Sequence, residues 1–374
     1  MKKKIYYWCP FFSNIATIKA VINSAISLKK FSNSEYDPVI IDVFGEWRDH
    51  QSILEENNIS IERLNLDKYF KEKKIQGYLK SRYYQIKIFF LAFLPLLRLI
   101  QEKKPNTIIL HLVTSLPLFI NFIYNFKTNI ILRISGFPRL NYFRNFFWKI
   151  MLQKVNTITT PTVATKNKLS DILKRNDIFL LKDPIIYLKN IKLKKIDKNK
   201  KKYFLAVGRL TKQKNFIFLL HCFKSIIQNN KNVILKILGD GEDYNKLNQY
   251  IIKNNLQKNI FLAGYKNNVF DYFADAEAFI LSSLWEDPGF VLVEAAFANT
   301  TIISSDCNNG PTEILEKGKN GFLFKSNDKQ DFLKIFEEFK KSDQKIIYKK
   351  KINSKRMSKK YSLFSHFLEL KKII

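Results

Sequence analysis

The chain has 374 residues, of which 46% are hydrophobic, with 33 Phe and 17 Tyr among them. This length predicts about two domains of ~150 residues, and the wealth of aromatic and branched apolar residues excludes an intrinsically disordered chain. The 64 Lys and Arg against 33 Asp and Glu give a formal net charge of +31. Such a charge attracts nucleic acid, anionic membranes or phosphorylated substrates. The cations are spread along the chain and also clustered at residues 191–202 and 345–360, and a solvated basic surface without a ligand is an equally good explanation.

The N-terminal half alternates short apolar runs with longer helical stretches. The strand candidates are residues 5–8, 38–43, 107–111, 129–134 and 157–160, and the helix candidates are residues 17–28, 78–102 and 144–153. This alternation predicts a parallel sheet whose strands are connected by helices.

Two hydrophobic segments of this half need a separate interpretation. The first sixteen residues begin with lysines, as a signal peptide does, but their apolar part is short and broken by Pro10, so we expect a core strand over residues 5–9. Residues 88–97 form an uncharged run of ten residues between Lys87 and Arg98. A bilayer core requires ~20 residues, so this run predicts a buried or interfacial helix with a kink at Pro95. No membrane-spanning segment is expected.

The pattern weakens over residues 183–202, which end in a lysine-rich run and predict a linker. Beyond it the alternation of strands and helices is clearer. The expected strands are 203–207, 233–238, 260–262, 278–282 and 301–304, and the expected helices are 216–228, 244–254, 269–274, 289–298 and 312–316. Five strand–helix units in this order predict a Rossmann-like domain. The expected architecture is therefore α/β, with two Rossmann-like domains facing each other across a cleft.

Two loops of the second half carry residues suited to an anionic, polyhydroxylated ligand. Residues 208–215 (Gly-Arg-Leu-Thr-Lys-Gln-Lys-Asn) place Arg209 and Lys214 just before a helix, and such cations can hold a diphosphate. Residues 285–295 contain Glu286 and Glu294 on either side of the start of the next helix, where Gly289 lets a ligand approach free backbone N–H groups. Each loop alone is also explained by ordinary surface charge in so basic a chain.

The combination of motifs is more specific. Gly-Arg-Leu-x-Lys-x-Lys-Asn (208–215), Leu-Gly-Asp-Gly (238–241), Ser-x-x-Glu-x7-Glu-Ala (283–295), Gly-Pro-x-Glu-Ile-Leu (310–315) and Gly-x-Asn-Gly-Phe-Leu-Phe (318–324) follow one another in the chain. Together they resemble the retaining nucleotide-sugar glycosyltransferases of family 4, which have the GT-B fold. The resemblance is strong over residues 200–330 and weaker over residues 1–200.

The resemblance implies a division of roles in the second domain. It assigns Arg209 and Lys214 to the donor diphosphate, Glu286 to the transferred sugar and Glu294 to the ribose. The remaining donor-binding candidates are Gly208, Gly239, Gly264, Tyr265, Gly289, Phe290 and Val291, with the nucleotide base placed near residues 264–266. Glu286, Arg209 and Lys214 are the catalytic candidates.

The first domain departs from the family pattern. Many relatives have a glycine pair after the first strand, where this chain has Phe-Ser-Asn-Ile-Ala-Thr (residues 12–17), and a cleft histidine where this chain has Ser135. His111 follows another strand, and a strand-end or core role explains it better than a catalytic one. Asn14, His111 and Ser135 are therefore the acceptor-cleft candidates, and none of them is identified as a general base.

No metal or cofactor is expected. The chain contains no Asp-x-Asp motif and its four histidines show no metal-ligand spacing, which agrees with the metal independence that the resemblance implies. The three cysteines, Cys9, Cys222 and Cys307, lie far apart in the sequence, which favours a reducing compartment over a disulfide framework.

The sequence thus predicts residues 1–185 as an acceptor-binding domain, 186–350 as a donor-binding domain and 351–374 as a C-terminal helix that crosses back to the first. The predicted activity is sugar transfer from a nucleotide diphosphate sugar to a lipid-linked or polysaccharide acceptor, as in lipopolysaccharide synthesis. The predicted location is the cytoplasmic face of an anionic membrane, bound peripherally and without nucleic acid. The alternatives are a catalytically impaired GT-B scaffold and a basic polyanion-binding or nucleic-acid-binding protein.

Overall fold

The computed structural model describes residues 2–12, 15–70, 78–137, 142–187 and 202–374. The chain forms two compact units: unit 1 comprises Met1–Ile185 and Leu363–Ile374, and unit 2 comprises Ile186–Ser362. The return of the C-terminus to the first unit agrees with the expected crossing. The expected boundary at residue 350, however, falls inside helix α14 (Gln344–Ser358), which stays with unit 2.

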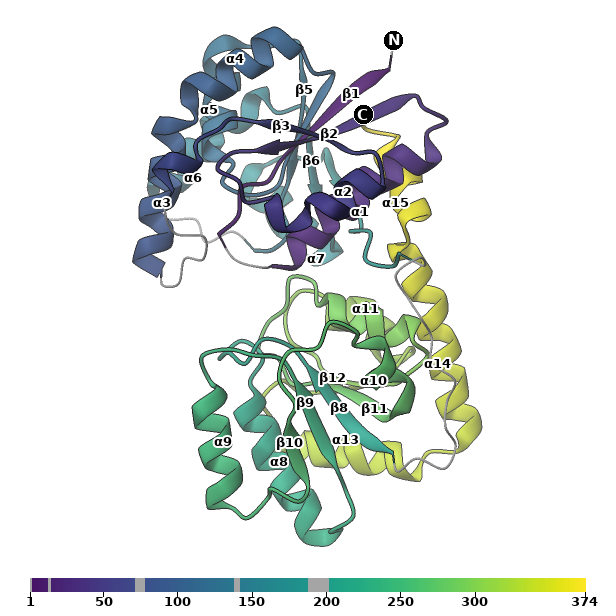
Figure 1. The fold of residues 1–374 in the computed structure, drawn as a ribbon. Helices are drawn as coiled ribbons and strands as arrows, with labels where there is room; N and C mark the ends of the chain where they lie inside the picture. The colour runs from purple at the N-terminus through teal and green to yellow at the C-terminus, as the bar shows by residue number, and fades with distance from the viewer. Residues whose placement is uncertain (1, 13–14, 71–77, 138–141, 188–201) are drawn as a thin grey trace. The chain divides into compact units, whose positions relative to one another are not determined.

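Unit 1 contains a seven-stranded parallel sheet with helices on both faces (Figure 1). Its strands are β1 (Lys3–Trp8), β2 (Tyr36–Asp42), β3 (Ser60–Arg63), β4 (Thr107–Leu110), β5 (Asn129–Arg133), β6 (Thr157–Thr160) and β7 (Ile178–Leu180). The strand order is β3-β2-β1-β4-β5-β6-β7. The order therefore reverses between β1 and β4.

Helices of unit 1 cover both faces of this sheet, and the side chains of β1 make apolar contacts on one face and a polar contact on the other. They are α1 (Ala16–Phe31), α2 (Gln51–Glu56), α3 (Tyr78–Leu91), α4 (Phe93–Lys103), α5 (Ser115–Tyr124), α6 (Tyr142–Met151), α7 (Val163–Leu173) and α15 (Leu363–Leu370). Tyr6 and Trp8 of β1 join the apolar core that α3 to α6 complete. Tyr7 points the other way, as alternation along a strand requires, and its hydroxyl lies 2.9 Å from Ser24 Oγ on α1.

The single helix expected over residues 78–102 is two helices. α3 and α4 meet at Ala92 with a bend of 50°. Pro95 explains the break, because it has no N–H to donate to the carbonyl one turn earlier, at Leu91. Among the described residues no single helix is long and apolar enough to cross a membrane, and this bent pair meets the length and composition test only when its two helices are taken together.

Unit 2 contains a six-stranded parallel sheet in the order β10-β9-β8-β11-β12-β13. Its strands are β8 (Tyr203–Val207), β9 (Leu235–Leu238), β10 (Ile260–Leu262), β11 (Ala276–Leu281), β12 (Thr301–Ser305) and β13 (Phe322–Phe324). Its α-helices are α8 (Phe216–Asn229), α9 (Tyr244–Lys253), α10 (Phe270–Asp275), α11 (Phe290–Phe297), α12 (Pro311–Ile314), α13 (Lys329–Lys341) and α14. Phenylalanines of β8, α8 and α13 form much of the core on one face.

Three strands of the structure were not predicted: β3, β7 and β13. Each lies at an edge of its sheet and has only three or four residues. An edge strand is covered less completely than a central one, so its apolar pattern is short and weak. The central strands were all expected, because burial on both faces makes them continuous apolar runs.

Candidate active site

The candidate site of unit 2 lies where its strand order reverses, between β8 and β11. In an open parallel sheet the loops at the carboxyl ends of two such strands diverge to opposite faces and leave room for a ligand. The loop after β8 carries Arg209 and Lys214, and the loop after β11 carries Glu286. The reversal thus brings together two loops that are more than seventy residues apart in the sequence.

Lys214 and Glu286 form an ion pair at this point. The Lys214 ammonium nitrogen lies 2.5 Å from Glu286 Oε1, and the side chains are only 13% and 4% exposed. Ser283 Oγ donates a second hydrogen bond to the same carboxylate oxygen, also at 2.5 Å. Charge-assisted hydrogen bonds of this kind are stronger than neutral ones, so the pair fixes a positive and a negative group side by side. Lys214 and Glu286 were both expected from the sequence. Ser283 was not expected at the site, although it is the first residue of one of the motifs.

Hydrogen bonds between neighbouring loops hold this pair in place. Leu284 N donates to Gln213 O at 2.9 Å and Glu286 N donates to Asn308 O at 3.1 Å. Ser282 Oγ donates to the carbonyl of Lys214 itself at 2.8 Å. The loop that carries the carboxylate is therefore tied directly to the loop that carries the ammonium group.

Gly289 allows helix α11 to start against the carboxylate. Its φ of +92° is a conformation that favours glycine, and a Cβ at this position would lie 3.3 Å from Glu286 Cγ. The first N–H groups of α11, around Phe290 and Val291, have no partner within the helix by its geometry. With the positive end of the helix dipole they suit an anionic or hydroxylated ligand.

The loops after β8, β9 and β10 come close together at three glycines. A Cβ on Gly239 would lie 1.9 Å from the carbonyl oxygen of Gly208, and Gly239 N donates to Gly264 O at 2.9 Å. The Lys214 side chain lies over Gly208, where a Cβ would meet its Cε at 3.0 Å. The backbones of Gly208, Gly239 and Gly264 therefore lie next to one another, and Gly208 lies against the lysine side chain.

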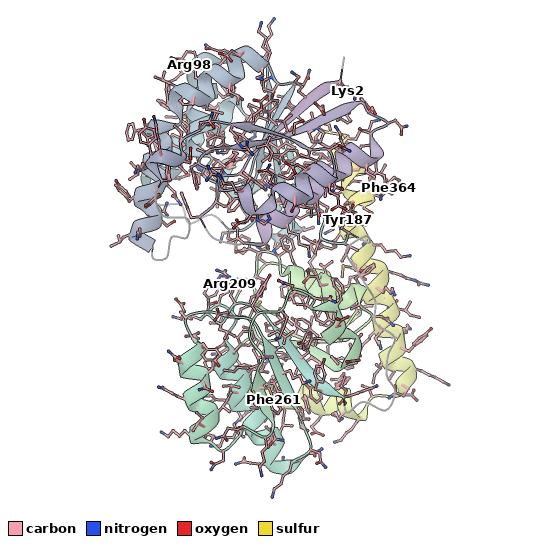
Figure 2. All side chains as sticks on the ribbon, viewed as in Figure 1. Lys2, Arg98, Tyr187, Arg209, Phe261 and Phe364 are labelled. Carbon is pink, nitrogen blue, oxygen red and sulfur yellow. The ribbon has the colours of Figure 1, made fainter. Side chains whose placement is uncertain are left out.

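The other donor candidates lie around this centre with different exposures. Arg209 is exposed, and its side chain forms no hydrogen bond or ion pair with any residue that the structure describes (Figure 2). Tyr265, directly after Gly264, is 74% exposed. Glu294 is half-buried on α11. The structure thus places a free guanidinium and a free aromatic ring at the rim of the site.

Other nucleophilic or metal-binding chemistry is not assembled here. Burial raises the pKa of the Cys307 thiol, close to the ion pair, to about 12, so this cysteine stays protonated and unreactive at neutral pH. Within the described ranges no cluster of three His, Cys, Asp or Glu could hold a metal ion.

The acceptor candidates belong to unit 1. Asn14 lies outside the described residues, and Ser135 is half-buried just after β5. Both ring nitrogens of His111 are buried without a hydrogen-bond partner among the described residues. Burial, with a smaller effect of Arg133, lowers the pKa of His111 to about 3, so the ring is neutral. His111 therefore has the surroundings of a core residue.

The second half of the chain is similar in sequence to a family of known proteins. Residues 189–360 match the family model of the glycosyl transferases group 1. A solved structure of Anabaena Alr3699/HepE in complex with UDP and glucose superposes with a TM-score of 0.72 at 15% identity, over 100% of this chain and 99% of that one. The fold is GT-B.

Two relatives extend the likeness to the sequence level. An uncharacterized glycosyltransferase of Methanocaldococcus jannaschii, MJ1059, is 33% identical over 59% of this chain and 60% of its own length. The N-acetylgalactosamine-N,N'-diacetylbacillosaminyl-diphospho-undecaprenol 4-alpha-N-acetylgalactosaminyltransferase of Campylobacter jejuni is 25% identical over 61% of this chain and 65% of its own length. The matches span less than two thirds of either relative. The chain is thus similar in sequence to parts of known glycosyltransferases.

Proposed function

We propose that this chain is a retaining glycosyltransferase of family 4 that transfers a sugar from a nucleoside diphosphate sugar bound in unit 2. The observation that carries the proposal is the buried Lys214–Glu286 pair next to the start of α11. It combines a cation for a diphosphate with a carboxylate for sugar hydroxyls, at the position in the sheet where such folds bind ligands. The exposed Arg209 adds a second cation that no described residue pairs with.

The residues of unit 2 would divide the work of the reaction. The acceptor hydroxyl oxygen forms a bond to the anomeric carbon on the face that the diphosphate leaves, the carbon–oxygen bond to the phosphate breaks, and the acceptor proton passes to the departing phosphate oxygen. Arg209, Lys214 and the first N–H groups of α11 stabilise the charge that develops on the diphosphate. Glu286 accepts hydrogen bonds from the transferred sugar. No metal ion is needed, because these groups supply the positive charge.

The nucleotide would extend from this centre along α11 and the glycine-lined backbone. Glu294 has two carboxylate oxygens for the ribose hydroxyls, and Tyr265 offers an exposed ring near Gly264 on which a base can stack. The complex of the Anabaena protein with UDP and glucose supports a nucleotide of this kind as the donor.

The acceptor would be a lipid-linked saccharide or a surface polysaccharide, bound by unit 1. The name of the Campylobacter relative, which includes a diphospho-undecaprenol, supports a lipid-linked acceptor. Such an acceptor requires the enzyme to work at a membrane surface, and the net charge of +31 favours an anionic leaflet. We place the enzyme peripherally on the cytoplasmic face.

The donor proposal is tested by isothermal titration of the full chain with UDP, GDP, ADP and TDP, with and without EDTA. Arg209→Ala should weaken binding of the preferred diphosphate about ten- to a hundredfold, because a hydrogen bond to a charged group contributes about 1.5–3 kcal/mol. Lys212→Ala is the matched control, an exposed lysine of the same loop, and should change the affinity less than threefold. Loss of binding in EDTA, or equal effects of the two variants, would contradict the proposal.

A further inference from the structure

Helix α3 of unit 1 presents an apolar stripe to solvent. Leu79, Tyr83, Ile86 and Phe90 are 82%, 59%, 59% and 73% exposed. Their spacing of four, three and four residues places them within an arc of about 60° on one side of the helix. An apolar face of this length that no described residue covers is unusual for a helix of a monomeric domain.

The opposite side of α3 is fixed in the core. Tyr84 and Ile88 are 7% and 0% exposed and belong to the apolar cluster of unit 1. α4 continues from α3 with Leu96 and Ile100 buried in the same cluster and Leu94 56% exposed. The stripe therefore cannot turn inward without unpacking unit 1, and its apolar side chains remain exposed.

Cations flank the stripe on both sides. At 100° per residue, Lys87 and Lys80 lie about 70° and about 90° from its centre on one side, and Arg82 lies about 70° from it on the other. Neither α3 nor the chain from Lys73 to Gln101 contains a single Asp or Glu, whereas this segment has six Lys and Arg. Apolar side chains with cations on either side match a surface whose interior is apolar and whose outer layer is negatively charged.

We propose that the α3 stripe, Leu79, Tyr83, Ile86, Phe90 and the adjoining Leu94, is the surface by which the protein docks on an anionic lipid leaflet. The apolar side chains enter the boundary between headgroups and acyl chains while Lys80 and Arg82 contact lipid phosphates. α3 lies in the plane of the leaflet and does not cross it. The inference deepens the proposed function, since it rests on an acceptor held in a membrane, but it concerns a surface that binds no donor.

Co-sedimentation of the full chain with vesicles tests the stripe. Phosphatidylglycerol vesicles should bind the protein, and Leu79→Ser/Phe90→Ser should lower the partition coefficient at least tenfold, because two large apolar side chains no longer leave water. Ile346→Ser/Tyr348→Ser is the matched control, since it changes two exposed apolar residues of the basic helix α14. This control should bind within twofold of the wild type.

A charge variant separates the cations from the apolar contacts. Lys80→Gln/Arg82→Gln should lower binding to phosphatidylglycerol vesicles about tenfold at low salt, and the difference should shrink at 0.5 M salt, where charges are screened. Lys87 is left unchanged, because its ammonium group donates to Tyr69 O at 2.6 Å. A fluorophore on Phe90→Cys should shift to the blue on binding, and the three native cysteines, which are buried, should not compete for the label.

Three results would overturn the inference: equal binding to neutral phosphatidylcholine vesicles, unchanged binding of the stripe variant, or a dimer of the wild type that the stripe variant dissociates. The last would assign the stripe to a second copy of the chain. Nucleoside diphosphate titration of the same variants keeps the two proposals apart, because a stripe variant that loses vesicle binding should keep its nucleotide affinity.

Discussion

The ion pair of the site should also stabilise unit 2, and Lys214→Met tests this. The substitution keeps most of the side-chain volume but removes the ammonium group that lies 2.5 Å from Glu286. Glu286 is then a 4% exposed carboxylate whose remaining side-chain donor is Ser283. Removing one partner of a buried ion pair costs about 3–5 kcal/mol, and we expect a loss of about 3 kcal/mol at pH 7.

Hydrogen exchange of the β8 and β9 amides measures this loss in unit 2 separately from unit 1. Lys340→Met is the matched control, because Lys340 pairs with Glu277 at 2.7 Å in the same unit but the two side chains are 41% and 28% exposed. An exposed pair contributes at most about 1 kcal/mol. The double variant Lys214→Met/Glu286→Gln, which leaves no unpaired charge, should recover about 2 kcal/mol. If Lys214→Met lost less than 1 kcal/mol, or the double variant were as unstable as the single one, the ion pair would not have the role described.

Glu286→Gln should lower kcat while leaving the affinity for a nucleoside diphosphate intact or improved, since it frees Lys214, whereas Glu294→Gln should mainly raise KM. Titration with a nucleoside diphosphate and steady-state rates compare the two variants. Abolished diphosphate binding in Glu286→Gln would contradict these roles. Gly239→Ala should lower the melting temperature at least twice as much as Gly318→Ala. Both glycines have positive φ, whose strain costs an alanine about 1–2 kcal/mol, but only at Gly239 would the added Cβ meet a carbonyl oxygen, that of Gly208, at 1.9 Å. Burial lowers the pKa of His366 to about 4, so its contribution to the stability of unit 1 is present above the ordinary pKa of 6.5 and is lost as the pH falls from there toward 4. Hydrogen exchange of the β1 amides should show that the free energy of unfolding of unit 1 falls by about 2 kcal/mol between pH 7 and pH 5 because of this residue. His366→Gln should abolish that fall, and the control His221→Gln in unit 2 should leave it unchanged.

The sequence alone determined the parts of the fold that depend on local pattern. The central strands of both units were predictable because each is a short apolar run between loops. The glycines of the unit 2 loops and the residues Arg209, Lys214 and Glu286 were also identifiable, because they belong to motifs of fixed spacing. Pro95 predicted a break in the long apolar helix, although the bend lies one turn earlier, at Ala92.

The tertiary structure decided which of these residues meet. Lys214 and Glu286 are 72 residues apart in sequence, and they pair because β8 and β11 are neighbours in the sheet, a choice that strand propensity does not encode. The same holds for Ser24 of α1, whose hydroxyl lies 2.8 Å from His366 Nε2 on α15 across 342 residues. It also holds for α14. The end of this helix was predicted to belong to the C-terminal segment that crosses to unit 1, but its packing places the whole helix in unit 2. Local sequence sets which elements form, because it fixes periodicity and turns, whereas the burial of one element by another sets where their polar side chains find partners.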